Sequence, residues 1–181
     1  YGDTNSMIEA MIASFLTIST PAWGNDVSMV QGKWDEFNRI EATCLAENVY
    51  HEARNQPLAG QMAVISVTIN RVNDDRFPNS ICEVVKQGPH RPSWKGTGEM
   101  IPIRHKCQFS WYCDGKSDRI YDKETYDQIY LLTDGIVSGT FEILDITEGA
   151  THYHADYVLP AWAKTKKKTI EIEDHIFYRW E

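Results

Sequence analysis

Residues 44–54 read CLAENVYHEAR, and residues 57–72 read PLAGQMAVISVTINRV. In the first stretch Leu45, Val49 and Ala53 recur at helical spacing, so the pattern predicts a helix from about residue 36 to residue 54. The second stretch begins with Pro57, which suits the first helical position, and it is apolar around most of its circumference. We predict two adjacent helices, the second being the central helix of the core.

Glu52 stands out within the first helix. It follows Val49 by three residues and therefore sits at the edge of the buried face. Partial shielding from water favours the neutral form of a carboxyl group, which can then donate a proton near neutral pH. The competing interpretation is a solvated surface glutamate, which is the commoner situation for this residue type.

The composition excludes several classes of protein. With 181 residues, 42% of them hydrophobic, the chain is long enough to bury a core as one globular domain. The formal net charge of −8 argues against nonspecific nucleic-acid binding. The lysines between residues 164 and 168 are interpreted as a solvated turn, with contact to an acidic substrate as the alternative.

Four cysteines permit two disulfides in three connectivities. Cys107 and Cys113 flank a short aromatic segment and form the favoured pair, whereas Cys44 could equally be a buried thiol. Apolar residues between Met7 and Leu16 predict an amphipathic helix that docks on the domain or on a partner, with a modified export segment as the alternative. The stretch from Pro21 to Asp35 is interpreted as a linker.

Further elements follow along the chain. Asn79 and Ser80 are predicted to cap a short helix that runs to Val85, and residues 88–106 are predicted to form a long loop. We expect a strand at 108–112, a helix begun by Asp122 and stopped by Gly139, and extended segments at 151–157, 169–172 and 175–180. Helices dominate and strands cluster late, which favours the α+β class.

A second set of polar residues could carry chemistry. His152 and His154 point to the same side of a predicted strand. With Glu52 they could bind zinc, as in an amidase that acts through metal-bound water. Polar histidines that line a cleft, or that are satisfied in the core, are the other interpretation.

The ordered blocks of the chain resemble the cell-wall hydrolases of the spore-cortex-lytic (SleB) type. The resemblance covers roughly residues 41–180. It rests on CLAENVYHEAR (44–54), PLAGQMAV (57–64), NRV (70–72), FP (77–78), CEVV (82–85), CQFSW (107–111), CDG (113–115), ATHYHA (150–155) and HIFY (175–178). Asn55 stands where the family usually has glycine, which suggests a left-handed backbone position there.

The resemblance implies a lysozyme-like α+β domain, mainly helical with a small antiparallel sheet, over residues 41–181. Residues 1–40 are then the N-terminal amphipathic helix and linker. It also implies cleavage of the β-1,4 bond between N-acetylmuramic acid and N-acetylglucosamine in peptidoglycan, with Glu52 as general acid and base. We favour a lytic transglycosylase, for which no second carboxylate is required; a muramidase would use one, and Asp75, Asp114 and Asp145 are available. The expected substrate-binding residues are Tyr50, Gln61, Gln108, Ser110, Trp111, His152, Tyr153 and His154.

The expected partner is the glycan strand of peptidoglycan, in the cell wall or periplasm, with no cofactor and no metal. A zinc-dependent N-acetylmuramoyl amidase and a noncatalytic wall-binding module are the rival functions. Whether the chain remodels a bacterial wall or acts as a phage endolysin is left open, as is its oligomeric state.

Overall fold

The computed structural model describes residues 24–181. The chain divides into two compact units, Tyr1–Glu36 and Phe37–Glu181. The amphipathic helix predicted at residues 7–16 lies outside the described residues, and the predicted domain boundary after residue 40 stays a prediction. Within the described part, none of the helices combines the length and the apolar character needed to cross a membrane.

Helix α2 runs from Gly24 to Ala53, and α3 runs from Leu58 to Val72. The linker predicted as far as Asp35 is therefore wrong. The side chains from residue 29 to residue 37 are all exposed. Val30, Trp34 and Phe37 nevertheless recur at helical spacing, a signal of this helix that the linker interpretation passed over. Asn55 has no positive φ, contrary to expectation. The chain instead leaves α2 through a tight turn in which the Gln56 N–H donates to the Ala53 carbonyl at 2.9 Å.

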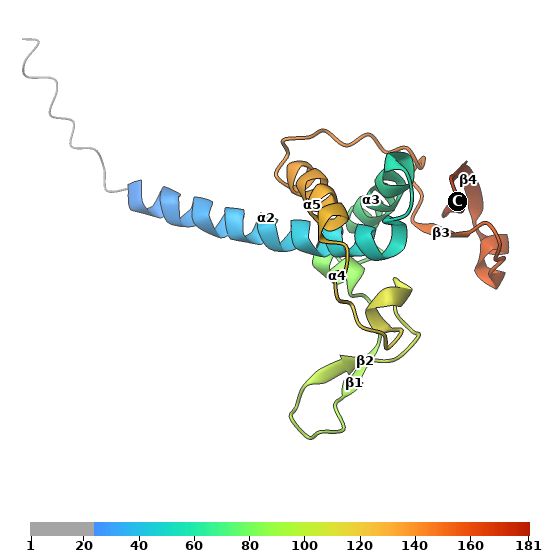
Figure 1. The fold of residues 1–181 in the computed structure, drawn as a ribbon, viewed down its shortest axis with the longest axis horizontal. Coiled ribbons are helices and arrows are strands. Elements are labelled where there is room, and N and C mark those ends of the chain that lie inside the picture. The colour runs from blue at the N-terminus through green and yellow to red at the C-terminus, as the bar shows by residue number, and fades with distance from the viewer. Residues whose placement is uncertain (1–23) are drawn as a thin grey trace, which may run out of the picture. The chain divides into compact units, whose positions relative to one another are not determined.

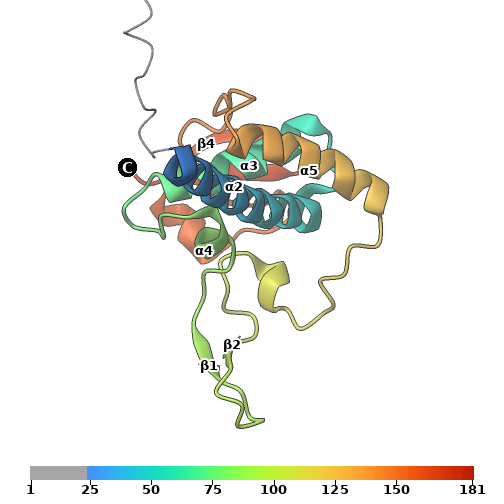
Figure 2. The ribbon, with the colours of Figure 1, turned by 90° about the vertical axis from the view of Figure 1, so that its left-hand side faces the viewer.

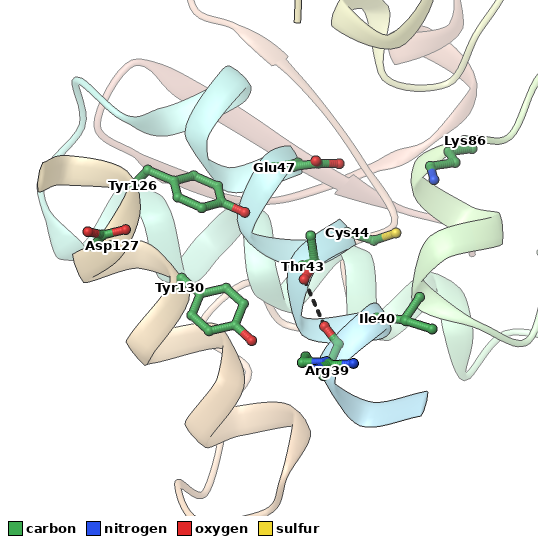
Figure 3. A pocket seen from close by; sticks show the side chains of 9 residues that line it. All are labelled: Arg39, Ile40, Thr43, Cys44, Glu47, Lys86, Tyr126, Asp127 and Tyr130. Atoms are coloured by element: carbon green, nitrogen blue, oxygen red, sulfur yellow. Dashed lines mark hydrogen bonds between the residues drawn. The ribbon is translucent and has the colours of Figure 1, made fainter. Parts of the chain in front are cut away.

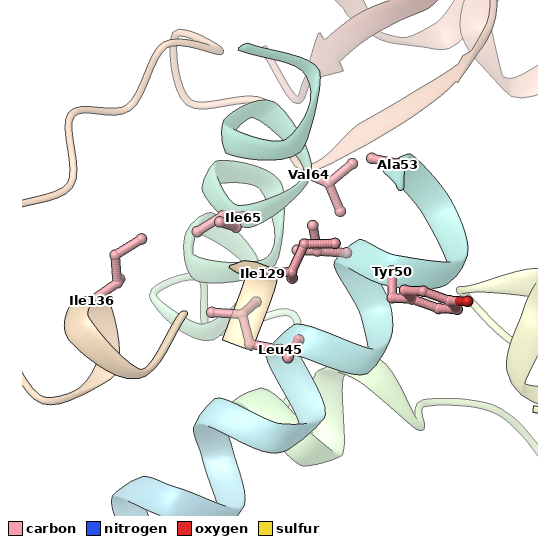
Figure 4. Packing of buried hydrophobic residues seen from close by; sticks show 9 residues of the cluster. Leu45, Tyr50, Ala53, Val64, Ile65, Ile129 and Ile136 are labelled. Carbon is pink, nitrogen blue, oxygen red and sulfur yellow. The ribbon is translucent and has the colours of Figure 1, made fainter. Parts of the chain in front are cut away.

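Helix α5 runs from Lys123 to Val137, and the short helix α4 spans Ile81–Val85. Both begin as predicted, because Asp122 and Ser80 accept hydrogen bonds from backbone N–H groups in the first turn. The second half of α2 lies beside α3 and α5 (Figures 1 and 2), and one apolar cluster joins the three helices (Figure 4). Its buried members are Leu45, Ala46, Val49, Tyr50, Ala53, Val64, Ile65, Ile129 and Ile136.

The opposite side of α3 contacts a sheet. Ala63 and Val67 are fully buried there and pack with Phe177. A helix enclosed by helices on one side and by a sheet on the other must be apolar on both sides, as its sequence indicated. Leu58 is 61% exposed because it begins the helix.

Two small antiparallel sheets complete the fold. Strands β3 (His152–Ala155), β5 (His175–Arg179) and β4 (Lys167–Ile172) pair in the order β3-β5-β4, with the 3₁₀ helix η2 (Ala161–Thr165) before β4. The predicted loop at 88–106 instead contains a hairpin of β1 (His90–Pro92) and β2 (Met100–Pro102). The predicted α+β class, mainly helical with small antiparallel sheets, is confirmed.

Two disulfides hold the segments around the core. Cys44–Cys82 joins α2 to α4, and Cys107–Cys113 closes the favoured short loop. The strand predicted at 108–112 is wrong, since Ser110–Cys113 forms the 3₁₀ helix η1. Closing a ring between Cys107 and Cys113 keeps this segment too compact for an extended strand.

Candidate active site

A cavity of about 490 Å³ surrounds the end of helix α2. Its walls come from α2, α3, the segment around η1, strand β3 with the loop that follows it, and β5. The lining residues are His51, Glu52, Arg71, Gln108, Phe109, Ser110, Trp111, Asp114, Tyr153, His154, Ala155, Tyr157, Val158 and His175. Segments far apart in the sequence therefore meet around one glutamate.

Glu52 is the second-last residue of α2 and is partly exposed to this cavity. The Tyr153 hydroxyl donates a hydrogen bond to its Oε2 at 2.9 Å. Burial raises the pKa of the Glu52 carboxyl above its ordinary value, although the hydrogen bond from Tyr153 and the charge of Arg71 act in the opposite direction. The carboxyl group thus keeps its proton to a higher pH than a solvated glutamate does.

Tyr153 is held from its other side by the sheet. It lies opposite Phe177 in the antiparallel register, and its ring also contacts that of His175 at 5.0 Å between centroids. Burial raises the pKa of the Tyr153 hydroxyl well above its ordinary value, so it stays protonated and remains a donor to Glu52 at neutral pH.

Trp111 forms a rigid part of the wall. Its ring stacks on His51 at 4.5 Å between centroids, and its indole N–H donates to Asn48 Oδ1 at 2.9 Å. The Asn48 amide in turn donates to Thr68 Oγ1 on α3 at 3.2 Å. Trp111 is only 9% exposed, so it serves core packing and cavity wall together.

The η1 segment contributes polar side chains as well. Gln108 and Ser110 are exposed and line the cavity, whereas Phe109 between them is buried. The Gln108 N–H donates to the Gln87 carbonyl at 3.0 Å, and this hydrogen bond fixes the start of the segment. The 3₁₀ conformation thus presents these two polar groups to the cavity without the strand that we expected.

Most of the predicted site residues meet in this cavity: Glu52, Gln108, Ser110, Trp111, Tyr153 and His154. Two others lie outside its lining. Tyr50 is 2% exposed, and its hydroxyl accepts the backbone N–H groups of Tyr121 and Asp122 at 3.2 and 3.0 Å, where it holds the start of α5. Gln61 turns back along its own helix and donates to the Gln56 carbonyl at 3.2 Å.

His152 also lies outside the lining, on the other face of the sheet. Successive residues of a strand point to opposite sides, and Tyr153 takes the side toward Glu52. His152 instead packs against Trp162 and Trp180, with ring centroids 5.4 and 5.5 Å away. Burial, with the nearby charge of Lys166, lowers the pKa of His152 to about 3, so it is neutral at physiological pH.

Of the two histidines in the zinc alternative, His154 lines the Glu52 cavity, but its Nδ1 lies 2.8 Å from the Ala155 carbonyl oxygen and is engaged within the protein. His154 packs on Trp162 like His152, and its Nε2 lies 3.0 Å from the Tyr178 hydroxyl. The predicted ligand set of two histidines and Glu52 is therefore not brought together. Across residues 24–181, no group of three histidine, cysteine, aspartate or glutamate side chains is arranged to hold a metal ion.

Several cavity residues were not predicted, among them His51, Arg71, Tyr157 and His175, whereas Asp114 was named as one of three available second carboxylates. Arg71 is held in the wall by a hydrogen bond from its Nε to the Thr151 carbonyl at 2.7 Å. Tyr157 is 84% exposed in the loop after β3. An aromatic residue so close to the ATHYHA block was a sequence signal that could have identified it. His51 directly precedes Glu52, but its contact with Trp111 depends on the tertiary fold.

A second cavity, of about 450 Å³, lies between α2, α4 and α5 (Figure 3). Glu47 projects into it from α2, together with Tyr126 and Tyr130 from α5 and Lys86 beyond α4. Burial also raises the pKa of Glu47. The two glutamates share a helix but line separate cavities, which makes Glu47 a matched control for Glu52.

Comparison with known proteins gives one family match. The family model described as "Cell Wall Hydrolase" matches residues 55–178. The spore cortex-lytic enzyme of Bacillus subtilis is 43% identical over 49 residues, which cover 27% of this chain and 16% of that protein. The spore cortex-lytic enzyme of Halalkalibacterium halodurans is 44% identical over 41 residues, which cover 23% of this chain and 12% of that protein. The matched stretch is thus a small part of each relative.

Two solved structures have similar folds. The catalytic domain of the Bacillus cereus SleB protein aligns with a TM-score of 0.51 and 26% identity, covering 77% of this chain and 89% of that domain. The catalytic domain of the germination-specific lytic transglycosylase SleB from Bacillus anthracis aligns with a TM-score of 0.53 and 27% identity, covering 77% and 93%.

Proposed function

Because the chain belongs to the cell wall hydrolase family, we propose that it cleaves the β-1,4 bond between N-acetylmuramic acid and N-acetylglucosamine in peptidoglycan, with Glu52 as general acid and base. The observation that carries the proposal is the partly buried Glu52 carboxyl, hydrogen-bonded to Tyr153 in a cavity of about 490 Å³. The likeness to SleB catalytic domains, one of them described as a lytic transglycosylase, supports the same chemistry.

The first step needs an acid. Protonated Glu52 gives its proton to the glycosidic oxygen while the bond from that oxygen to C1 of the muramic acid breaks, and positive charge develops at C1. Glu52 becomes a carboxylate inside the cavity. The Tyr153 hydroxyl already donates to Oε2, so one hydrogen bond to the developing anion is in place before the reaction.

The second step needs a base. The Glu52 carboxylate takes the proton of the muramic acid 6-hydroxyl as that oxygen attacks C1, and a 1,6-anhydro ring closes. Glu52 is protonated again at the end, so one residue completes the cycle.

A hydrolytic outcome would call on a second carboxylate that activates water. Asp114 is the candidate among the three aspartates considered, because it lines the cavity with Glu52. Asp145 accepts hydrogen bonds from Thr147 and Gly149, and Asp75 is exposed away from the cavity lining. We favour the anhydro route because it requires no partner for Glu52.

The aromatic and polar walls suit a sugar chain. Trp111 and the exposed Tyr157 offer ring faces, whereas the exposed Gln108 and Ser110 offer hydrogen-bonding groups for hydroxyl and acetamido substituents. The proposed partner is accordingly a glycan strand of peptidoglycan, and the proposed place of action is the cell wall or periplasm.

Mass spectrometry of the soluble products from purified peptidoglycan tests this function. We expect 1,6-anhydro muropeptides from the unmodified chain, no products from Glu52→Gln, and normal release from the control Glu47→Gln. Circular dichroism must show that all three proteins fold alike. Reducing muropeptides would mean a muramidase that uses Asp114, and free stem peptides would mean an amidase. Binding to peptidoglycan with no release would mean a noncatalytic wall-binding module.

A further inference from the structure

Arg71 is a buried cation in the wall of the Glu52 cavity. It is 4% exposed, on the last turn of α3, and its Nε donates to the Thr151 carbonyl at 2.7 Å. Its Nη1 is buried and has no hydrogen-bond partner within the described residues. The guanidinium carbon lies 4.7 Å from the ring centroid of Phe109. It also lies 5.4 Å from the ring centroid of Phe77. One hydrogen bond and two aromatic rings are modest compensation for burying a full charge.

The positive charge of Arg71 persists at neutral pH. Burial lowers the pKa of Arg71 to about 10, while the charges of Tyr153 and Glu52 act to raise it. The four salt bridges found among residues 24–181 do not include Arg71 or Glu52. Arg71 is also the one lysine or arginine among the described residues that line this cavity. A permanent cation therefore acts on Glu52 without a direct ion pair.

We propose that Arg71 is a positioning residue that acts through Glu52, because its buried guanidinium stabilises the carboxylate that forms when Glu52 has given up its proton. This inference rests on the proposed function and deepens it. A buried carboxyl with no nearby cation would hold its proton too tightly to release it quickly. Tyr153 and Arg71 together limit that effect, so that Glu52 serves as acid in the first step and as base in the second.

Other titratable groups line the cavity with Glu52: Tyr153 and His154 on β3, Tyr157 in the loop after β3, His51 on α2, Asp114 after η1 and His175 on β5. Burial lowers the pKa of both His51 and His175, so neither histidine supplies a positive charge at neutral pH. Tyr153 is neutral for the reason given above, and Asp114 would oppose the effect of Arg71. Beside the hydrogen bond from Tyr153, the positive charge that stabilises the Glu52 carboxylate therefore comes from Arg71.

The pH dependence of fragment release tests the role of Arg71. A general acid gives an alkaline limb, because activity falls as the acid loses its proton. Removal of the cation in Arg71→Met and Arg71→Gln should lower the maximal rate and move this limb upward by about one pH unit, since a nearby opposite charge is worth that much or more. Arg71→Lys keeps the charge and should show a smaller shift. Arg76→Gln, which removes an exposed arginine paired with Asp74, should leave the limb unchanged.

A purely structural role for Arg71 predicts a different result. If the neutral variants lose activity but keep the alkaline limb in place, Arg71 merely supports the Thr151 carbonyl and the inference is overturned. Arg71→Gln retains a donor for that carbonyl, so it remains informative if Arg71→Met does not fold.

A readout without activity separates this inference from the proposed function. The Glu52 carboxyl can be followed by ¹³C NMR during a pH titration of the unmodified chain and of Arg71→Gln. An upward shift of its midpoint in the variant supports the coupling even if peptidoglycan proves not to be the substrate, and an unchanged midpoint overturns it.

Discussion

The disulfide that closes the longer loop, Cys44–Cys82, should stabilise the fold more than Cys107–Cys113. Cys44 and Cys82 are 38 residues apart, and the chain-entropy relation gives about 4 kcal/mol for a loop of that length. Cys107 and Cys113 are 6 residues apart, for which the same relation gives about 2 kcal/mol. Replacing Cys44 and Cys82 together by alanine should therefore lower the free energy of unfolding by about twice as much as replacing Cys107 and Cys113.

Equilibrium unfolding in urea, monitored by tryptophan fluorescence and circular dichroism, measures both losses in the full chain. The order of the effects on activity should be reversed, because Gln108, Ser110 and Trp111 lie inside the smaller loop and line the Glu52 cavity. If the Cys107 and Cys113 pair proves the more stabilising, or if its removal leaves fragment release untouched, the reasoning fails.

Three further substitutions have expected outcomes. Asn48→Ala leaves the buried indole N–H of Trp111 without an acceptor, so unfolding in urea should show a loss of about 1–3 kcal/mol and fragment release should slow. Tyr50→Phe removes the acceptor for the Tyr121 backbone N–H, so the free energy of unfolding should fall by about 1 kcal/mol. The KM for peptidoglycan should stay unchanged, and a raised KM would show that Tyr50 contacts the substrate. The unfolded chain protonates His152 near pH 6.5 and the folded chain near pH 3, so stability should fall as the pH drops between these values. His152→Phe should flatten that dependence. If the Tm of the variant falls with pH as that of the unmodified chain does, His152 is not the group responsible.

Elements with strong local signals could be predicted from the sequence. Pro57 followed by a predominantly apolar stretch defines α3, and Asp122 and Ser80 mark the starts of α5 and α4 through side-chain oxygens that cap their first turns. The beginning of α2 was missed although Val30, Trp34 and Phe37 recur at helical spacing, because polar and glycine residues between them were interpreted as a linker. The hairpin β1–β2 was missed because its strands are three residues long and partly exposed.

Some residues of the candidate site could be predicted from sequence motifs alone. Others could not, because their role depends on which face of a strand or helix lines the cavity. Glu52 and Trp111 follow from their motifs. His152 and Tyr153 were both expected to contact substrate, yet adjacent strand residues point to opposite sides, and the sequence does not say which side faces Glu52. Arg71 was not among the expected site residues, because its place in the wall of the Glu52 cavity arises only when α3 packs against the sheet.

A raised pKa is not by itself a mark of the active site. Burial raises the pKa of Glu47 as it does that of Glu52. Glu52 differs because a tyrosine donates to it and a buried arginine lies in the same cavity wall. The proposed acid is thus defined by its partners as well as by its burial.

The central claim is that Glu52 holds its proton to an unusually high pH. Assignment of its side-chain carboxyl resonance in ¹³C NMR spectra, by comparison with Glu52→Gln, allows that one group to be titrated directly. The midpoint should lie clearly above about 4.3, the ordinary value for a solvated glutamate. A midpoint at or below that value would contradict the assignment of Glu52 as the proton donor.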